Sequence, residues 1–124
     1  MTLSLQGSKV LWVIIIITNN LFIQIFLFLV KHGTPSNDEL EELGSLIGGN
    51  WRRLGRRLCI TDESLEEIEG ATGYDLPEKG YRMLRQWKQQ CGSAATYKVL
   101  CEALKHKLVK RQDLAVKFCY INGN

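Results

Sequence analysis

The sequence predicts an all-α protein: a six-helix antiparallel bundle preceded by a hydrophobic N-terminal segment. Two observations predict this fold. After residue 36, apolar residues recur at spacings of three and four, as they do on one face of an α-helix, and no segment alternates like a strand. Residues 10–30, in contrast, carry no charge and are mostly apolar. The chain is therefore expected to divide into a hydrophobic segment, 1–32, and one helical domain, 36–120.

The hydrophobic segment has four interpretations. A transmembrane helix over residues 10–30 has the required length of about 20 residues, although Asn19, Asn20 and Gln24 lie near its centre. A cleaved signal peptide is disfavoured, because no A-x-A-like pattern precedes a cleavage point after Val30. A buried helix is also disfavoured, because the segment is apolar on every face while the domain after it is small. The fourth interpretation is that these residues are not part of the native protein. The length favours a membrane span or anchor.

The first helix of the domain is expected to begin after an N-cap at Ser36 or Asn37 and to end at Gly48-Gly49. Its buried face is predicted to consist of Leu40, Leu43 and Ile47. The second helix, residues 51–58, is expected to be capped by Asn50. At 100° per residue, its apolar side holds Trp51, Leu54 and Leu58, and its opposite side holds Arg52, Arg53, Arg56 and Arg57.

The third helix is expected to be capped by Thr61 or Asp62 and to end at Gly70. Leu65 and Ile68 form its predicted buried pair. Its opposite side carries an acidic cluster made of Glu63, Glu66 and Glu67. The second and third helices thus place a basic strip beside an acidic one.

Three more helices complete the predicted bundle. The fourth begins with Pro77 in its first turn, the fifth after Ser93 or Thr96, and the sixth near Gln112. Their apolar stripes contain Leu76, Gly80, Met83, Leu84 and Trp87, then Val99, Leu100, Ala103, Leu104 and Leu108, then Leu114, Ala115 and Phe118. The residues predicted to form the centre of the core are Trp51, Leu54, Leu58, Leu65, Ile68, Leu84, Trp87, Leu100 and Leu104.

Composition argues against several classes of function. After residue 32, Lys and Arg exceed Asp and Glu by one, which is poor support for a general nucleic-acid binder. The four cysteines have no C-x-x-C spacing, and only His32 and His106 accompany them, so no metal site is predicted. No catalytic constellation and no phosphate-binding glycine motif is present, so we expect neither an enzyme nor a cofactor.

Several segments resemble death domains. The resemblance lies in N-W-R-R-L-G-R-R-L at residues 50–58, T-D-E-S-L-E-E-I-E at 61–69, M-L-R-Q-W at 83–87, and A-T-Y-K-V-L at 95–100 followed by A-L at 103–104. It covers about residues 37–118 and is closest to the death domains of Fas-associated adaptors. It implies a six-helix Greek-key bundle without catalytic activity.

The resemblance also implies a function. It implies homotypic binding to other death-domain proteins, receptors or adaptors, in cytoplasmic apoptotic or inflammatory signalling, and it places Arg52, Arg53 and Arg56 on partner-binding positions. The charge pattern adds Arg57 and the three glutamates, since complementary patches steer association and set its register. Two alternatives are a membrane-anchored helical protein with a structural or inhibitory role and a basic DNA-binding bundle. The cysteines are then expected to be reduced thiols, most of them at least half-buried.

Overall fold

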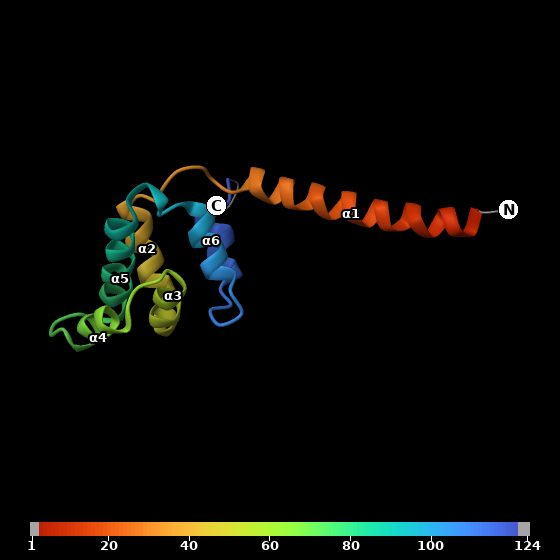
Figure 1. Ribbon diagram of the computed structural model, residues 1–124. Coiled ribbons are helices and arrows are strands. Elements are labelled where there is room, and N and C mark those ends of the chain that lie inside the picture. The colour runs from red at the N-terminus through yellow and green to blue at the C-terminus, as the bar shows by residue number, and fades with distance from the viewer. Residues whose placement is uncertain (1–2, 122–124) are drawn as a thin grey trace.

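A computed structural model describes residues 3–121, with the side chains of residues 3–8, 22–24 and 26–28 left out of the description. Six helices, α2 to α7, pack into one bundle, and α1 projects from it as a single rod (Figure 1). The predicted all-α bundle is confirmed. The helices are α1 Leu3–Leu29, α2 Asn37–Ile47, α3 Trp51–Arg57, α4 Asp62–Gly70, α5 Leu76–Cys91, α6 Tyr97–Lys105 and α7 Gln112–Cys119, with short 3-10 helices at Gly48–Asn50 and Gly92–Ala94.

Four helices begin at side-chain caps. The caps of α2, α4, α5 and α6 are Ser36, Thr61, Asp75 and Thr96, and each side-chain oxygen accepts a hydrogen bond from the backbone amide three residues later. At α2 the arrangement is reciprocal, because the Glu39 carboxylate accepts from the Ser36 amide at 3.1 Å. Such caps satisfy amides that have no partner inside the helix.

Asn50 does not cap α3 as predicted. It ends the 3-10 helix Gly48–Asn50, and its backbone angles, φ −83° and ψ 4°, are not the extended ones that a capping residue adopts. Its side-chain amide instead donates to the carbonyl of Val109 at 3.3 Å. This bond holds the start of α3 beside the α6–α7 loop, residues 106–111.

The core is continuous across the bundle. Each of the nine residues expected at its centre is buried, with Trp87 at 1% exposure and Trp51 at 2%. Three residues predicted on apolar stripes are exposed instead: Leu76, Val99 and Leu108. Leu76 is the first residue of α5, and Val99 lies on the outer side of α6. Leu108 lies beyond the end of α6, so helical spacing no longer places it on the apolar side.

The closest packing in the bundle is between α2 and α5. A Cβ atom built on Gly44 would lie 2.6 Å from the backbone nitrogen of Tyr81, and one built on Gly80 would lie 2.6 Å from the carbonyl oxygen of Gly44. Both contacts are with backbone, which cannot move aside as the end of a side chain can. Only glycine at these two positions lets the helices approach this closely.

The segment before α2 is tied to the bundle. Val30 pairs with Tyr120 in an antiparallel bridge, flanked by hydrogen bonds from the Lys31 amide to the Cys119 carbonyl and from the Ile121 amide to the Leu29 carbonyl, both 2.7 Å. Val30 is 2% exposed and belongs to the core cluster. The end of α1 and the end of α7 are therefore joined.

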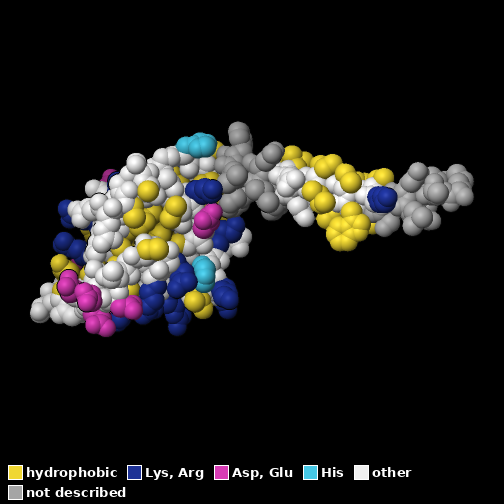
Figure 2. Space-filling view, in the orientation of Figure 1, with side chains coloured by type: hydrophobic (Ala, Val, Ile, Leu, Met, Phe, Trp, Pro, Cys, Tyr) yellow, Lys and Arg dark blue, Asp and Glu magenta, His cyan; other side chains and the backbone are white. Residues whose placement is uncertain are grey.

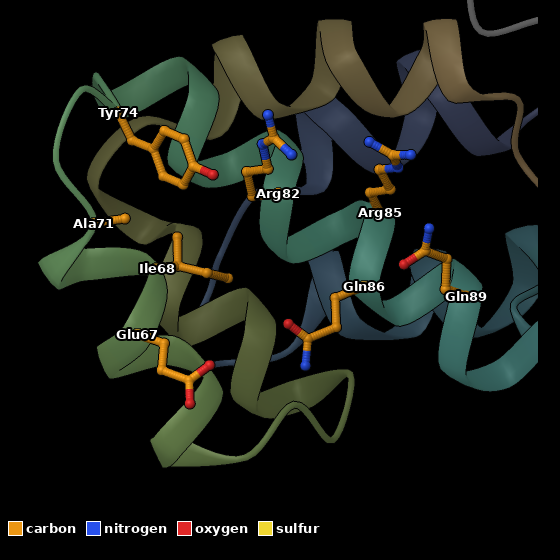
Figure 3. A pocket seen from close by; sticks show the side chains of 8 residues that line it. All are labelled: Glu67, Ile68, Ala71, Tyr74, Arg82, Arg85, Gln86 and Gln89. Atoms are coloured by element: carbon orange, nitrogen blue, oxygen red, sulfur yellow. The ribbon is translucent and has the colours of Figure 1, made fainter.

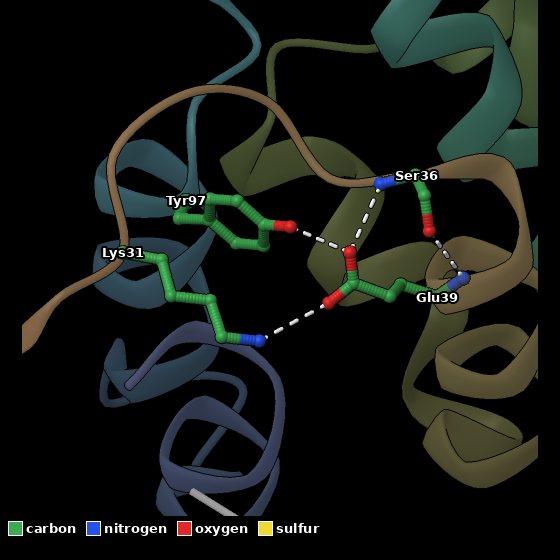
Figure 4. A network of polar contacts seen from close by, with 4 residues as sticks. All are labelled: Lys31, Ser36, Glu39 and Tyr97. Atoms are coloured by element: carbon green, nitrogen blue, oxygen red, sulfur yellow. Dashed lines mark hydrogen bonds and ion pairs between the residues drawn. The ribbon is translucent and has the colours of Figure 1, made fainter. Parts of the chain in front are cut away.

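A polar network reinforces this junction (Figure 4). The Tyr97 hydroxyl donates to Glu39 at 2.5 Å, and the Lys31 ammonium lies 3.3 Å from the same carboxylate. Partial burial raises the pKa of Glu39, but hydrogen bonds from Tyr97, Ser36 and Lys31 outweigh it, so the pKa lies below its ordinary value. Burial and the Glu39 contact raise the pKa of Tyr97. The network joins the start of α2 to α6 and to the end of α1.

The structure does not support the transmembrane interpretation of residues 10–30. Side chains from Val10 to Ile17 are exposed along α1, the largest fraction being 64% at Trp12. Among the described residues, however, no helix combines the length and the apolar character that crossing a membrane requires. Among the residues whose side chains are described, Thr18, Asn19 and Asn20 interrupt the apolar run. The predicted span also includes residues 22–24 and 26–28, which lie outside the described side chains.

Candidate interaction surface

The buried side of α3 determines which way its arginines point. Trp51 and Leu54 are buried against the core. At Gly55, an added Cβ would lie 2.8 Å from a Leu65 methyl group and 3.0 Å from Met83 Cγ, so a small residue lets α3 lie directly against α4 and α5. The opposite side of α3 consequently faces solvent.

Three of the four predicted arginines are exposed, and one is not. Arg53, Arg56 and Arg57 are exposed, whereas Arg52 is half-buried, and its Nε is buried without a hydrogen-bond partner among the described residues. Arg52 lies only 100° from Trp51 around the helix, at the edge of the buried side. The basic face of α3 is therefore made of Arg53, Arg56 and Arg57, with Arg52 at its margin.

The acidic cluster lies on the adjoining helix, α4. Glu63, Glu66 and Glu67 are exposed, while Leu65 and Ile68 on the other side of the helix are buried. Figure 2 shows acidic side chains gathered at the α4 end of the molecule and basic side chains beside them. The structure thus presents the two strips next to each other on one side of the bundle.

The two strips are joined within the molecule by one weak contact. Arg56 Nε lies 3.4 Å from a carboxylate oxygen of Asp62, with both side chains largely in solvent. Exposed pairs of this kind contribute about 0–1 kcal/mol. Among the described residues, Glu63, Glu66, Glu67, Arg53 and Arg57 form no ion pair, so their charges stay available to a partner.

The basic surface continues past α3 onto the α6–α7 loop, which sequence reasoning did not predict. Lys107, Leu108 and Lys110 are exposed there, and the Asn50–Val109 hydrogen bond holds the loop beside α3. The run K-H-K-L-V-K-R at residues 105–111 is the signal in the sequence. The predicted fifth helix extended to Leu108, but α6 stops at Lys105, so most of this run lies in the loop.

A hollow of about 600 Å³ lies between α4, the following loop and α5, and Glu67 of the acidic cluster is among the residues that line it (Figure 3). Ile68 and Ala71 contribute apolar surface to it. Arg82 stacks 5.0 Å from the centre of the Tyr74 ring and bonds Glu78 at 2.8 Å, and Gln86 donates to Ser64 at 2.8 Å, so much of its polar lining is already paired. The Tyr74 ring is partly buried and packs against the core.

The cysteines are free thiols. Cys101 and Cys119 are buried, Cys91 is half-buried and Cys59 is exposed. A hydrogen bond between the two buried thiols lowers the pKa of Cys101 and, together with burial, raises that of Cys119. Within the described part of the chain, no three His, Cys, Asp or Glu side chains are grouped so that they could hold a metal ion.

Exposed, complementary charge strips on a helical bundle are suited to binding other proteins. Residues 37–119 match the family described as Death domain, and the chain belongs to this family. A curated relative is the FAS-associated death domain protein of Bos taurus, 36% identical over 59 residues. The matched region covers 48% of this chain and 28% of the relative, so the similarity concerns a minor part of that protein.

Proposed function

We propose that this chain is a homotypic interaction module that binds other death domains in cytoplasmic receptor signalling of the apoptotic or inflammatory kind. Membership of the death domain family and the similarity to the FAS-associated protein support the class of partner. The basic face of α3 and the acidic cluster of α4 are the surfaces proposed to make the contacts.

The observation that carries this proposal is the pair of adjoining strips, whose charges are largely unpaired among the described residues. Arg53 and Arg57 form no ion pair among the described residues, and Arg56 has a single exposed one. Guanidinium groups bind carboxylates through two parallel hydrogen bonds, which adds direction to the attraction. The glutamates of a second domain are therefore suitable partners for these arginines.

The two strips permit head-to-tail association. The basic and acidic surfaces are different patches on one molecule, so a contact between them uses unlike surfaces on the two partners. After one such contact, the first domain keeps a free acidic cluster and the second keeps a free basic face. Repetition of this contact builds an oligomer of several domains.

The test is binding of the full-length chain to a panel of purified death domains, this chain among them, measured by co-precipitation. The double variant Arg53→Glu, Arg56→Glu should no longer bind the death domain that the wild type co-precipitates. Its circular dichroism spectrum should remain helical, because both side chains are exposed. Arg85→Glu, an exposed arginine of α5, is the matched control and should bind normally.

A charge swap makes the test specific. A chain carrying Glu63→Arg and Glu66→Arg should restore binding to the Arg53→Glu, Arg56→Glu chain, because the reversed strips attract again. Unchanged binding by the arginine variant, or no rescue by the swap, would remove this face from the proposed interface.

A further inference from the structure

Three adjoining hollows run from the end of α6 across the basic face of α3 to the α6–α7 loop. Their volumes are about 330, 130 and 440 Å³. The first and second share Arg56 and Arg57, and the second and third share Arg53 and Leu108. The shared residues make the three hollows one concave surface rather than three separate sites.

Most of the charged groups that line this surface are cations. Five permanent cations line it: Arg53, Arg56, Arg57, Lys107 and Lys110. Only Arg56 has an ion pair within the described residues, the exposed contact with Asp62. Like charges held close together repel one another, and an anion placed among them relieves that repulsion.

His106 adds a donor aimed at the same place. Its Nδ1 accepts a hydrogen bond from the Leu108 amide at 3.1 Å, so the proton of the neutral ring lies on Nε2. This Nε2 lies 3.5 Å from Nη1 of Arg57, which is also a donor. Two donors facing each other cannot bond, but both can donate to an oxygen atom placed between them.

One carboxylate opposes an anion here. Glu102 lines the first hollow, one helical turn before His106 on α6. It lines neither of the other two hollows, which are bordered by Asn50, Leu108 and the remaining cations. The opposing carboxylate is therefore confined to the α6 end of the surface.

We propose that this concave surface binds a small, multiply phosphorylated anion such as an inositol polyphosphate, free or as a lipid head group. Phosphate oxygens accept several N–H donors from different directions, as Arg57, His106 and the neighbouring cations supply them. Several phosphates on one small ring match a row of cations spread over three hollows. The concavity suits a compact anion, because a hollow contacts such a ligand from several sides at once.

The experiment is isothermal titration of the full-length chain with inositol hexakisphosphate at fixed ionic strength. Arg57→Gln should weaken binding about tenfold or more, because a charge-assisted bond is lost. Arg85→Gln removes the same charge from α5 and should change the dissociation constant less than twofold. Glu102→Gln should tighten binding, since it removes the opposing carboxylate. Equal weakening by Arg57→Gln and Arg85→Gln, or no titratable heat, would overturn the proposal.

A second arm identifies the source of the phosphate. Flotation is measured with phosphatidylcholine vesicles containing either phosphatidylinositol bisphosphate or phosphatidylserine at equal surface charge. Preference for the phosphoinositide, lost in Arg57→Gln, supports a lipid head group, whereas binding of the soluble compound alone supports a free ligand. Equal flotation with both lipids and no soluble binding would show charge attraction without a phosphate site. Neither arm contains a death domain partner, so failure here is distinct from failure of the proposed function.

Discussion

The α2–α5 contact and the outer face of α3 differ in what they tolerate. At Gly44 and Gly80 the two backbones touch so closely that no side-chain atom fits, whereas Arg53 and Arg57 extend into solvent without an ion pair among the described residues. The first region determines whether the bundle forms, and the second has little influence on it. Substitutions in the two regions should therefore separate stability from recognition.

The largest expected effect is at the centre of the core. Trp87→Ala removes a side chain that is 1% exposed, and it should lower the free energy of unfolding by about 3–5 kcal/mol. Urea denaturation followed by circular dichroism measures this. A loss below about 1 kcal/mol would mean that Trp87 is not packed as described.

The next effect tests the close approach of the helices. Gly80→Ala should cost about 1–3 kcal/mol, because the new methyl group meets the Gly44 carbonyl and the helices must separate. Gly70→Ala, in α4 with open space around it, is the matched control and should be neutral or slightly stabilising. Equal thermal midpoints for the two variants would contradict the described contact.

A smaller effect is expected at the junction network, and it depends on pH. Tyr97→Phe should cost about 1 kcal/mol through loss of the bond to Glu39. Because the pKa of Glu39 is depressed in the folded state, its contribution is present above the ordinary value of 4.5 and is lost as the pH falls through the folded-state pKa.

Thermal unfolding between pH 3 and pH 7 measures the contribution of this carboxylate. The stability of Glu39→Gln should fall less steeply in acid than that of the wild type, because the variant has no proton to take up at this site. Parallel curves for the two proteins would show that the network does not perturb Glu39.

The smallest effect is expected on the outer face of α3. Arg53→Ala should change the free energy of unfolding by no more than about 0.5 kcal/mol, since the side chain is exposed and forms no ion pair among the described residues. The same urea titration as for Trp87→Ala measures it. A large loss would indicate that Arg53 supports the fold, and would weaken its use as a probe of binding.

Patterns local to one helix could be predicted from the sequence, and contacts between distant segments could not. The caps at Ser36, Thr61 and Thr96 depend on a few neighbouring residues, and each was one of two candidates. Asn50 has the residue type of a cap, but its conformation is set by the preceding 3-10 helix and by Val109, 59 residues away. Local propensity gives no information about such a partner.

The candidate surface shows the same limit. The angular positions on α3 indicated an arginine face, yet Arg52 lies at its buried edge because the packing of α3 against its neighbours decides where that edge falls. His106 takes part in the concave surface only because it lies beside Arg57, a residue 49 positions away in the sequence. Leu108 was placed on a helix that ends three residues earlier, so its exposure was also missed.

The bridge between Val30 and Tyr120 has a practical consequence. It places the entry and exit of the folded bundle at one pole, away from α3 and the α6–α7 loop (Figure 1). A fluorescent tag fused at either end would therefore leave the arginines uncovered. The same proximity makes the bundle a natural candidate for circular permutation, with a short linker across the bridge and new ends opened in a loop.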